Sequence, residues 1–140
     1  MQALLDAGVA VGTELPQIAR KFKLEHFVRK DEKTIHTDVE AARREGLEQP
    51  VAIATHVGGL IFHQLRVSFG RGWVEGGSCS LTFRRPVGVT DFCEARGVVT
   101  GREDVEGGVR ISCDVWIVNQ HGEKVVVGNA RCTLPKASPC

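Results

Sequence analysis

The sequence predicts an α+β fold in which an antiparallel sheet wraps around a single buried helix. Between residues 51 and 66, apolar side chains recur at spacings of three and four residues, which is the period of a helix. Residues 78–134 then divide into four runs of alternating apolar and polar side chains, bounded by turns rich in glycine and proline. A helix and such strands bury their apolar surfaces together most simply when the helix packs on one face of the sheet.

Three shorter elements are predicted ahead of the long helix. Residues 17–22 have the pattern of a short strand that follows a loop, and residues 24–30 suit one or two helical turns. Residues 39–45 are predicted as a short helix, because Thr37 and Glu40 have the spacing of a capping box. In such a box each side chain accepts the backbone N–H of the other residue, which favours a helix start at this point.

The long helix is predicted over residues 51–66, between Pro50 and a more polar stretch. Gly46 is a natural C-cap for the short helix before it, because glycine tolerates the left-handed backbone found there. Gly58 and Gly59 lie in the middle of the long helix and weaken it by about 1 kcal/mol each. Glycines in such a position are typical where another group approaches the helix closely.

Four strands are predicted after the helix, as an antiparallel meander over residues 78–84, 92–102, 109–119 and 124–134. One face of the last strand carries several small residues, which we interpret as room for the helix to pack close to the sheet. Together with residues 17–22 these runs give five strands and an exposed sheet edge. Pairing two such edges removes the exposed backbone groups, so a homodimer or higher homo-oligomer is predicted.

The composition is that of a soluble globular protein, with 42% apolar and 25% charged residues. The 140 residues suit one domain with its core over about residues 12–134, and the proline-containing residues 135–140 are expected to fray. A net charge of +1 gives no reason to expect nucleic acid or a membrane as partner. The chain has no apolar run of about 20 residues, and its first residues lack the basic stretch of a secretion signal.

Five cysteines are present, and no two of them form a C-x-x-C pair. Cys79, Cys113 and Cys132 lie in predicted strands, where a free thiol behaves as a small apolar side chain. This odd number of cysteines, several of them in strands, favours reduced thiols over a disulfide framework. We therefore expect a cytoplasmic protein.

Residues 30–56, KDEKTIHTDVEAARREGLEQPVAIATH, carry the most informative motif. It consists of an acidic residue, an Ile-His-x-Asp core, a short helix, a Gly-Leu pair and a proline, here Asp31, residues 35–38, residues 41–43, residues 46–47 and Pro50. This motif resembles the signature of the MaoC-like hydratases and dehydratases. The similarity in pattern continues through residues 70–77 to about Leu134, so it covers most of the chain.

The resemblance implies a single hot-dog domain that hydrates a trans-2-enoyl thioester or dehydrates a 3-hydroxyacyl thioester, carried by coenzyme A or a carrier protein. His36 takes the position of the family's catalytic histidine and Asp31 that of its catalytic aspartate, with Glu32 as the alternative carboxylate. The backbone N–H of Ala54 or Thr55 would meet the thioester oxygen. No cofactor is implied beyond the carrier of the substrate.

These residue types suit the chemistry of hydration. Water adds to C3 of the enoyl group and a proton to C2, so one group must take a proton from water and return one to carbon. An imidazole does either near neutral pH, and a carboxylate orients the water. The oxygen of the developing enolate needs hydrogen-bond donors, which the N-terminus of a helix supplies as free backbone N–H groups.

The family pattern has a His-Gly pair where this sequence has Ile53 and Ala54, so His56 is the nearest histidine that can replace the missing one. His56 and His63 are seven residues apart and share a helix face, where both suit the wall of an acyl pocket. The spacing of the histidines and carboxylates does not predict a metal site.

Three other functions fit the same sequence. A hot-dog thioesterase would release a free thiol, which hydration does not. A non-catalytic acyl-binding subunit would fit the missing His-Gly pair. A tailoring enzyme of a biosynthetic pathway would use the same acid/base pair on a different carbon skeleton. The sequence lacks G-x-S-x-G, a glycine-rich phosphate loop and a dinucleotide fingerprint, which excludes the enzyme classes that depend on them.

Overall fold

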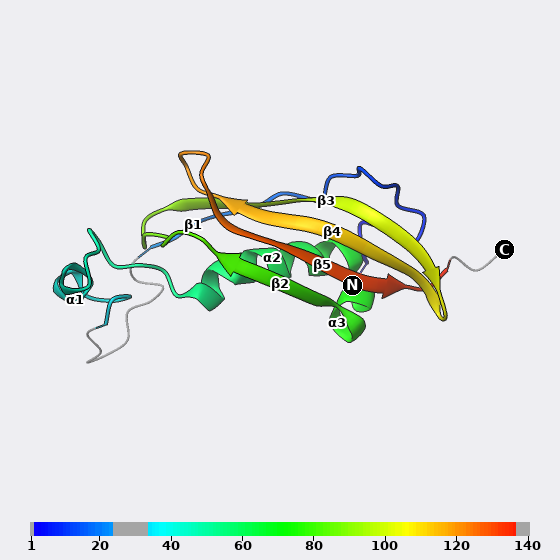
Figure 1. The fold of residues 1–140 in the computed structure, drawn as a ribbon, viewed down its shortest axis with the longest axis horizontal. Helices are drawn as coiled ribbons and strands as arrows, with labels where there is room; N and C mark the ends of the chain where they lie inside the picture. Colours follow the sequence, from blue (N-terminus) through cyan, green and yellow to red (C-terminus); the bar gives the residue numbers. More distant parts are fainter. Residues whose placement is uncertain (1, 24–33, 137–140) are drawn as a thin grey trace.

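The computed structural model describes residues 2–23 and 34–136, and it has the predicted α+β architecture (Figure 1). Helix α2 packs on one face of a five-stranded antiparallel sheet, with the chain before β1 running along the sheet. The elements are β1 (Ile18–Lys21), α1 (Val39–Arg44), α2 (Ala54–Phe69), α3 (Arg71–Gly76), β2 (Ser78–Phe83), β3 (Phe92–Val105), β4 (Gly108–Val118) and β5 (Lys124–Leu134). The helical turns predicted over residues 24–30 and the end of the chain from 137 lie outside the described residues.

The strand order is β1-β3-β4-β5-β2, which differs from the predicted meander in the position of β2. Strands β3, β4 and β5 do form a meander, but β2 pairs with β5 instead of β3, with Leu81 opposite Gly128. The reason is that β1 occupies the free edge of β3, where Ile18 lies opposite Ala95. Only the outer edge of β5 is then available, so β1 and β2 become the two edges of the sheet.

Helix α2 begins at Ala54 and not at Val51, so the predicted start is wrong by three residues. The backbone N–H of Val51 donates to the Ile35 carbonyl at 2.9 Å, and that of Ala52 donates to the Val87 carbonyl at 2.6 Å. These contacts hold the two residues in an extended conformation, so the helix begins only after them. At its other end α2 continues to Phe69, and Gly70 follows with a φ of +58°.

Helix α1 forms where it was predicted and lies at one end of the molecule, away from the sheet (Figure 1). The predicted capping box is wrong: Asp38 is the N-cap, and it makes no side-chain capping bond. The Thr37 hydroxyl instead accepts the N–H of Thr34 at 2.9 Å, which closes the turn before the helix. Gly46 follows the helix with a φ of +81°, which confirms its predicted role at the C-terminal end.

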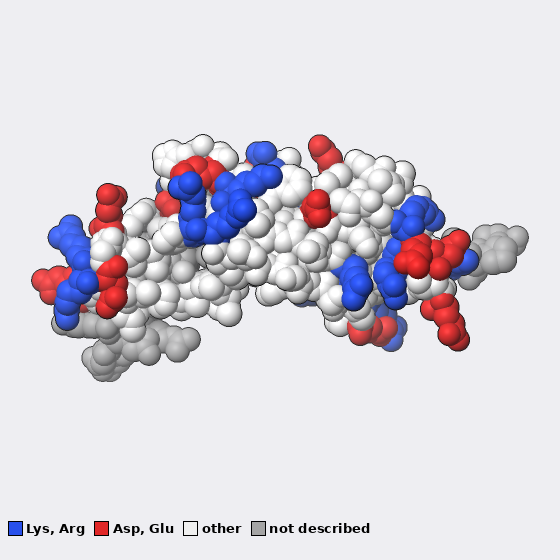
Figure 2. Space-filling model, viewed as in Figure 1, with Lys and Arg blue, Asp and Glu red and all other residues white. Residues whose placement is uncertain are grey.

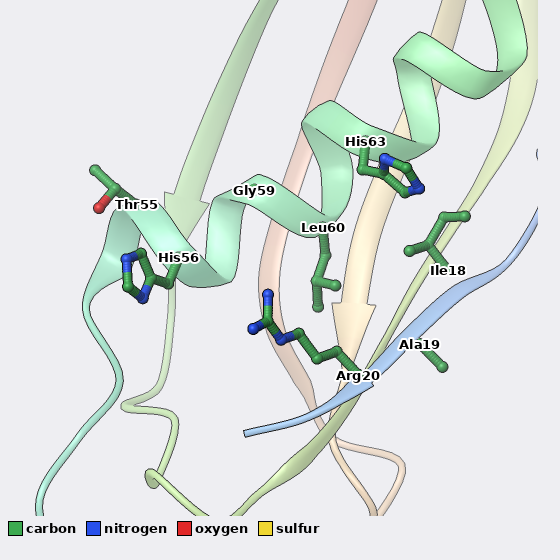
Figure 3. A pocket seen from close by; sticks show the side chains of 8 residues that line it. All are labelled: Ile18, Ala19, Arg20, Thr55, His56, Gly59, Leu60 and His63. Carbon is green, nitrogen blue, oxygen red and sulfur yellow. The ribbon is translucent and has the colours of Figure 1, made fainter. Parts of the chain in front are cut away.

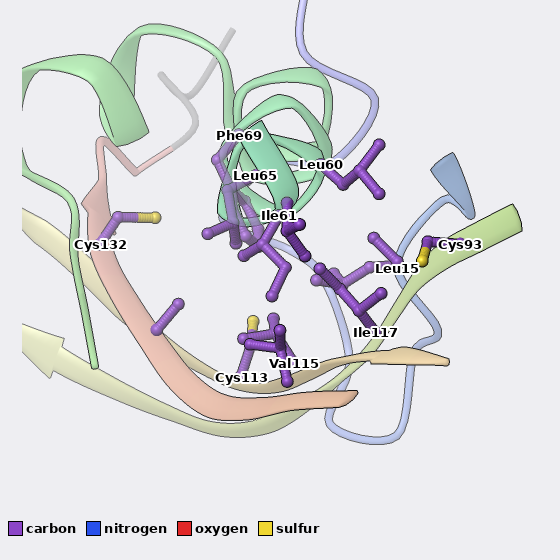
Figure 4. Close-up of a cluster of buried hydrophobic side chains, with 14 of the residues drawn as sticks. Leu15, Leu60, Ile61, Leu65, Phe69, Cys93, Cys113, Val115, Ile117 and Cys132 are labelled. Atoms are coloured by element: carbon purple, nitrogen blue, oxygen red, sulfur yellow. The ribbon is translucent and has the colours of Figure 1, made fainter. Parts of the chain in front are cut away.

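The core lies between α2 and the inner face of the sheet (Figure 4). Alternate residues of β4 face inward, as predicted, and the second half of α2 covers them with apolar side chains. The main fully buried members are Ile61, Leu65, Cys93, Ile111, Val115 and Ile117. The small residue Gly128 serves a purpose other than the predicted one, because a Cβ there would collide with the Ser80 carbonyl oxygen of β2. It therefore admits the edge strand and not the helix.

The four cysteines among the described residues are free, and three of them are buried. Burial raises the pKa of the Cys93 thiol and of the Cys113 thiol to about 12, and that of the Cys132 thiol to about 11. Nearby negative groups, such as Asp91 beside Cys93, contribute a smaller increase. These thiols therefore stay protonated in the folded protein at neutral pH.

We expect the free energy of unfolding to fall as the pH rises above 9. Once unfolded, these thiols lose their protons near their ordinary pKa of 9.0, whereas in the folded protein they keep them up to about pH 11 to 12. Raising the pH through this window therefore favours the unfolded chain. Urea unfolding followed by circular dichroism at pH 8, 9 and 10 measures the effect, and a midpoint that is constant over this range would contradict it.

Charged side chains of both signs are interspersed on the face seen in Figure 2, and no field of one sign spans it. Two local pairs illustrate this, Arg85 with Glu123 at 2.8 Å and Arg96 with Glu94 at 2.7 Å. Such exposed pairs contribute little to stability. None of the helices in the described parts of the chain combines the length and apolar character that a membrane crossing requires.

Candidate functional site

His36 lies in the turn before α1, and its ring has a defined orientation. The imidazole Nδ1 is 2.8 Å from the carbonyl oxygen of Val51. A carbonyl oxygen only accepts hydrogen bonds, so Nδ1 carries the proton and donates it. In the neutral ring, Nε2 then has its lone pair free to accept a proton, which is what a general base requires. The side chain is half-buried, so the ring is partly accessible from outside.

Two backbone segments hold this ring in place. The His36 N–H donates to the Thr34 hydroxyl at 3.2 Å, which ties the turn together. The N–H of Val51 donates to the carbonyl of Ile35, so the turn and the extended segment before α2 are hydrogen-bonded side by side. Because the carbonyl of Ile35 and the ring of His36 both bond to Val51, the histidine lies beside the segment that leads into α2.

The N-terminus of α2 presents unused backbone donors. The N–H groups of His56 and Val57 both donate to the carbonyl of Ile53, at 2.9 and 3.2 Å. The N–H groups of Ala54 and Thr55 have no acceptor among the described residues, and the N-cap Ile53 offers no side-chain bond. Both residues are exposed. Free donors at the positive end of a 16-residue helix suit an oxygen that gains negative charge.

The predicted substrate-binding residues line two grooves, one on each side of the start of α2. Thr55 and His56 belong to a groove of about 730 Å³ between α2 and β1, which His63 also lines. Ala54 belongs to a smaller groove of about 270 Å³ beside the end of β2, where Phe83 and Arg84 are among the lining residues. The structure thus brings Thr55 and His56 together in one groove, whereas Ala54 lines the groove on the other side of α2.

Asp31 and its alternative Glu32 lie outside the described residues, so both stay predictions. Arg20 is a groove residue that the sequence reasoning missed. Its signal was the alternation of Ile18, Arg20 and Phe22 in the first strand, since Phe22 is buried and residues two apart share a face. Within residues 2–23 and 34–136, no group of three histidine, cysteine or acidic side chains is arranged to hold a metal ion.

Comparison with known proteins gives structural neighbours without sequence relatives. No family model matches the chain. A search of curated proteins finds no match either. Among solved structures, a MaoC-like dehydratase from Rhodospirillum rubrum superposes with a TM-score of 0.79 at 18% identity, over 98% of this chain and 100% of that one.

Two further neighbours agree with the first. An (R)-hydratase from A. caviae involved in PHA biosynthesis has a TM-score of 0.73 and 23% identity, over 91% of this chain and 98% of that chain. A chain of the ChsH1-ChsH2 complex from Mycobacterium tuberculosis matches with a TM-score of 0.73 and 20% identity, over 90% of this chain and 98% of that chain. At these identities the likeness concerns the fold. The chain therefore has the hot-dog fold of the MaoC-like dehydratases and (R)-hydratases, as the resemblance of residues 30–56 implied.

Proposed function

We propose that the protein is a hydro-lyase that hydrates a trans-2-enoyl thioester or dehydrates a 3-hydroxyacyl thioester. The observation that supports this most directly is the hydrogen bond from His36 Nδ1 to the Val51 carbonyl. It orients the imidazole of His36 against Val51, which lies three residues before the free N–H donors that begin at Ala54. An acid/base and an oxyanion donor are the two parts that thioester hydration needs.

In the hydration direction, His36 Nε2 takes a proton from a water molecule while the water oxygen bonds to C3. The electron pair of the C2–C3 double bond moves toward the thioester carbonyl, whose oxygen becomes negatively charged. The N–H groups of Ala54 and Thr55 stabilise this oxygen. The imidazolium of His36 then returns the proton to C2, which restores the thioester. Asp31, or Glu32 in its place, orients the water.

The replacement of the family's His-Gly pair by Ile53 and Ala54 is compatible with this proposal. An oxyanion donor is a backbone N–H group, which alanine has as well as glycine. The methyl group of Ala54 narrows the approach to that donor, so the shape of the bound acyl group would differ from that in the family. The chemistry itself does not require a side chain at this position.

We also propose a homodimer, formed through the β2 edge of the sheet. In the described part of the chain no strand pairs with the outer side of β2, and Phe83 in this strand is 47% exposed. Phe62 on α2 is 43% exposed, and both rings lie within 4 Å of the Cβ position at Gly58, so they form one apolar surface. In a dimer of this kind, the two β2 edges pair their free backbone groups and the two apolar surfaces are shielded from water. The free thiols favour a reducing compartment, and we propose the cytoplasm.

The test is a direct assay with crotonyl-CoA and a longer trans-2-enoyl-CoA. We expect the absorbance of the conjugated enoyl thioester to fall as water adds across the double bond. The same reaction mixtures are assayed for free thiol, which hydration leaves at background level. Thiol release would assign a thioesterase instead. An unchanged absorbance with both substrates would contradict the hydro-lyase proposal and favour an acyl-binding subunit.

A further inference from the structure

The larger groove, between α2 and β1, has a distinctive lining (Figure 3). Its volume is about 730 Å³. Strand β1 contributes one wall and the first three turns of α2 contribute the other, and the lining residues are Ile18, Ala19, Arg20, Thr55, His56, Gly59, Leu60 and His63. The helical members recur at spacings of three and four residues, so they form one continuous face of α2.

Arg20 occupies a position in β1 where an apolar side chain is expected. It lies opposite the buried Cys93 and alternates with Ile18 and with Phe22, which is only 1% exposed, so it belongs to the inner face of the strand. In Figure 3 its guanidinium extends from β1 toward Leu60 and His56 of α2. The sequence therefore directs a permanent positive charge toward the helix.

No carboxylate balances this charge among the described residues. The described residues that line the groove include no carboxylate, and none of the acidic side chains in residues 2–23 and 34–136 forms an ion pair with Arg20. The contact that Arg20 makes is with the Phe22 ring, whose centroid is 5.9 Å away. His63 adds an imidazole to the same groove. A guanidinium that pairs with no carboxylate of the described residues, and that shares a groove with an imidazole, suits an anionic ligand.

Apolar surface separates the helix N-terminus from these basic groups. Leu60 and Ile18 line the groove, and a Cβ at Gly59 would meet no atom of the described residues within 4 Å, so none of them fills the space above this turn. From Thr55 to Leu60, toward which the Arg20 guanidinium extends, the helix rises about 7.5 Å, which is close to the length of a chain of four methylene groups. The groove thus offers donors at one end, an apolar wall and then positive charge.

We propose that this groove binds the acyl part of the substrate, and that this acyl part ends in a carboxylate held by Arg20 with His63. The inference rests on the proposed function in one respect, namely that the thioester oxygen binds at the N-terminus of α2. It goes beyond that function because it assigns the substrate to the ω-carboxyacyl thioesters. Arg20 is exposed, and a terminal carboxylate would give its guanidinium a charge-assisted hydrogen-bond partner that a plain alkyl chain does not offer.

Calorimetric titration of the full chain with adipoyl-CoA and hexanoyl-CoA tests the proposal. The two thioesters have the same number of carbons and the same carrier, and they differ in the terminal carboxylate. Both are saturated, so neither is hydrated. We expect adipoyl-CoA to bind at least about tenfold more tightly, which is the size of one charge-assisted hydrogen bond. Arg20→Gln should abolish this preference, and Arg20→Lys should restore part of it.

Lys21→Gln is the matched control, because it removes the same charge from the neighbouring residue on the opposite face of β1. It should keep the preference for adipoyl-CoA. Equal binding of the two thioesters by the wild type, or no binding of either, would overturn the inference. So would an Arg20→Gln variant that loses affinity for both thioesters alike, since that would assign Arg20 to the phosphates of the carrier.

The binding preference is measured without turnover, so it can fail separately from the proposed reaction. If the protein prefers adipoyl-CoA but hydrates no enoyl thioester, the carboxylate site is supported and the proposed reaction is contradicted. If it hydrates crotonyl-CoA but shows no preference for adipoyl-CoA, the proposed reaction is supported and the carboxylate site is contradicted. His36→Ala should leave the preference unchanged, because His36 is not among the residues that line this groove.

Discussion

Replacing His36 with alanine should lower kcat/KM for the hydration of crotonyl-CoA by about 10²–10⁴-fold, the usual contribution of a general acid/base. The Val51 carbonyl that now accepts from Nδ1 holds the ring so that Nε2 faces away with its lone pair free. Without the imidazole, no group at this position takes the proton from water. The effect should appear in kcat, with KM changed little, because the ring acts in the transition state and not in binding.

His121→Ala is the matched control for this experiment. His121 lies in the hairpin between β4 and β5, and its ring contacts only the neighbouring Gln120 among the described residues. The variant should keep the wild-type rate. Nitrogen-15 spectra of the imidazoles give an independent reading, because His36 should be protonated at Nδ1 in the neutral ring. Full activity of His36→Ala would exclude the histidine from the reaction.

Replacing Gly128 with alanine should lower the free energy of unfolding by about 3 kcal/mol, the upper end of the usual cost of overpacking. Gly128 pairs with Leu81, and an added methyl group would collide with the Ser80 carbonyl oxygen and approach the Leu81 side chain to 2.8 Å. Since the main obstacle is backbone, relief requires β2 to move away from β5. Unfolding in urea, followed by circular dichroism, measures the loss.

Gly101→Ala provides the comparison. Gly101 lies in β3, and among the described residues a Cβ there would meet only the Cβ of Ser112, at an ordinary contact distance of 3.7 Å. The unfolding free energy of this variant should stay within about 1 kcal/mol of wild type, because alanine also reduces the freedom of the unfolded chain. Equal losses in the two variants would mean that the close approach of β2 to Gly128 is not what makes glycine necessary.

The strands of the meander were predictable because each alternates cleanly between an apolar and a polar face. The last strand covers residues 124–134 as predicted. Strands β3 and β4 extend further toward their common turn than predicted, to Val105 and from Gly108. The turn is that tight because Gly107 and Gly108 both adopt positive φ values, of +90° and +154°, and the sequence pattern alone does not disclose this.

The features that the sequence did not predict depend on contacts between distant segments. The three-residue delay of α2 follows from bonds between Val51 and Ile35 and between Ala52 and Val87. The pairing of β2 with β5 follows from the occupation of β3 by β1. Helix α3 was not predicted, because a six-residue segment with two glycines has little intrinsic preference for a helix.

Only part of the candidate site could be read from the sequence. The motif around His36 identified the histidine, but the Val51 carbonyl that orients its ring is fifteen residues away. The helix face that His56 and His63 share was predicted from their spacing of seven residues, and the structure shows that Thr55 lines the same groove. Arg20 carried a signal only through its alternation with a buried phenylalanine, which gains meaning once β1 lies across from α2.

Along α2, the positions suited to chemistry and those that hold the core are separated. Ala54, Thr55 and His56 in the first turn are exposed, whereas residues such as Leu65 and Phe69 near the other end are buried. One end of the helix is therefore accessible to ligands, and the other end anchors it in the core. Substitutions at the exposed end should therefore alter ligand binding at little cost in stability, whereas truncations at the buried end should lower the free energy of unfolding.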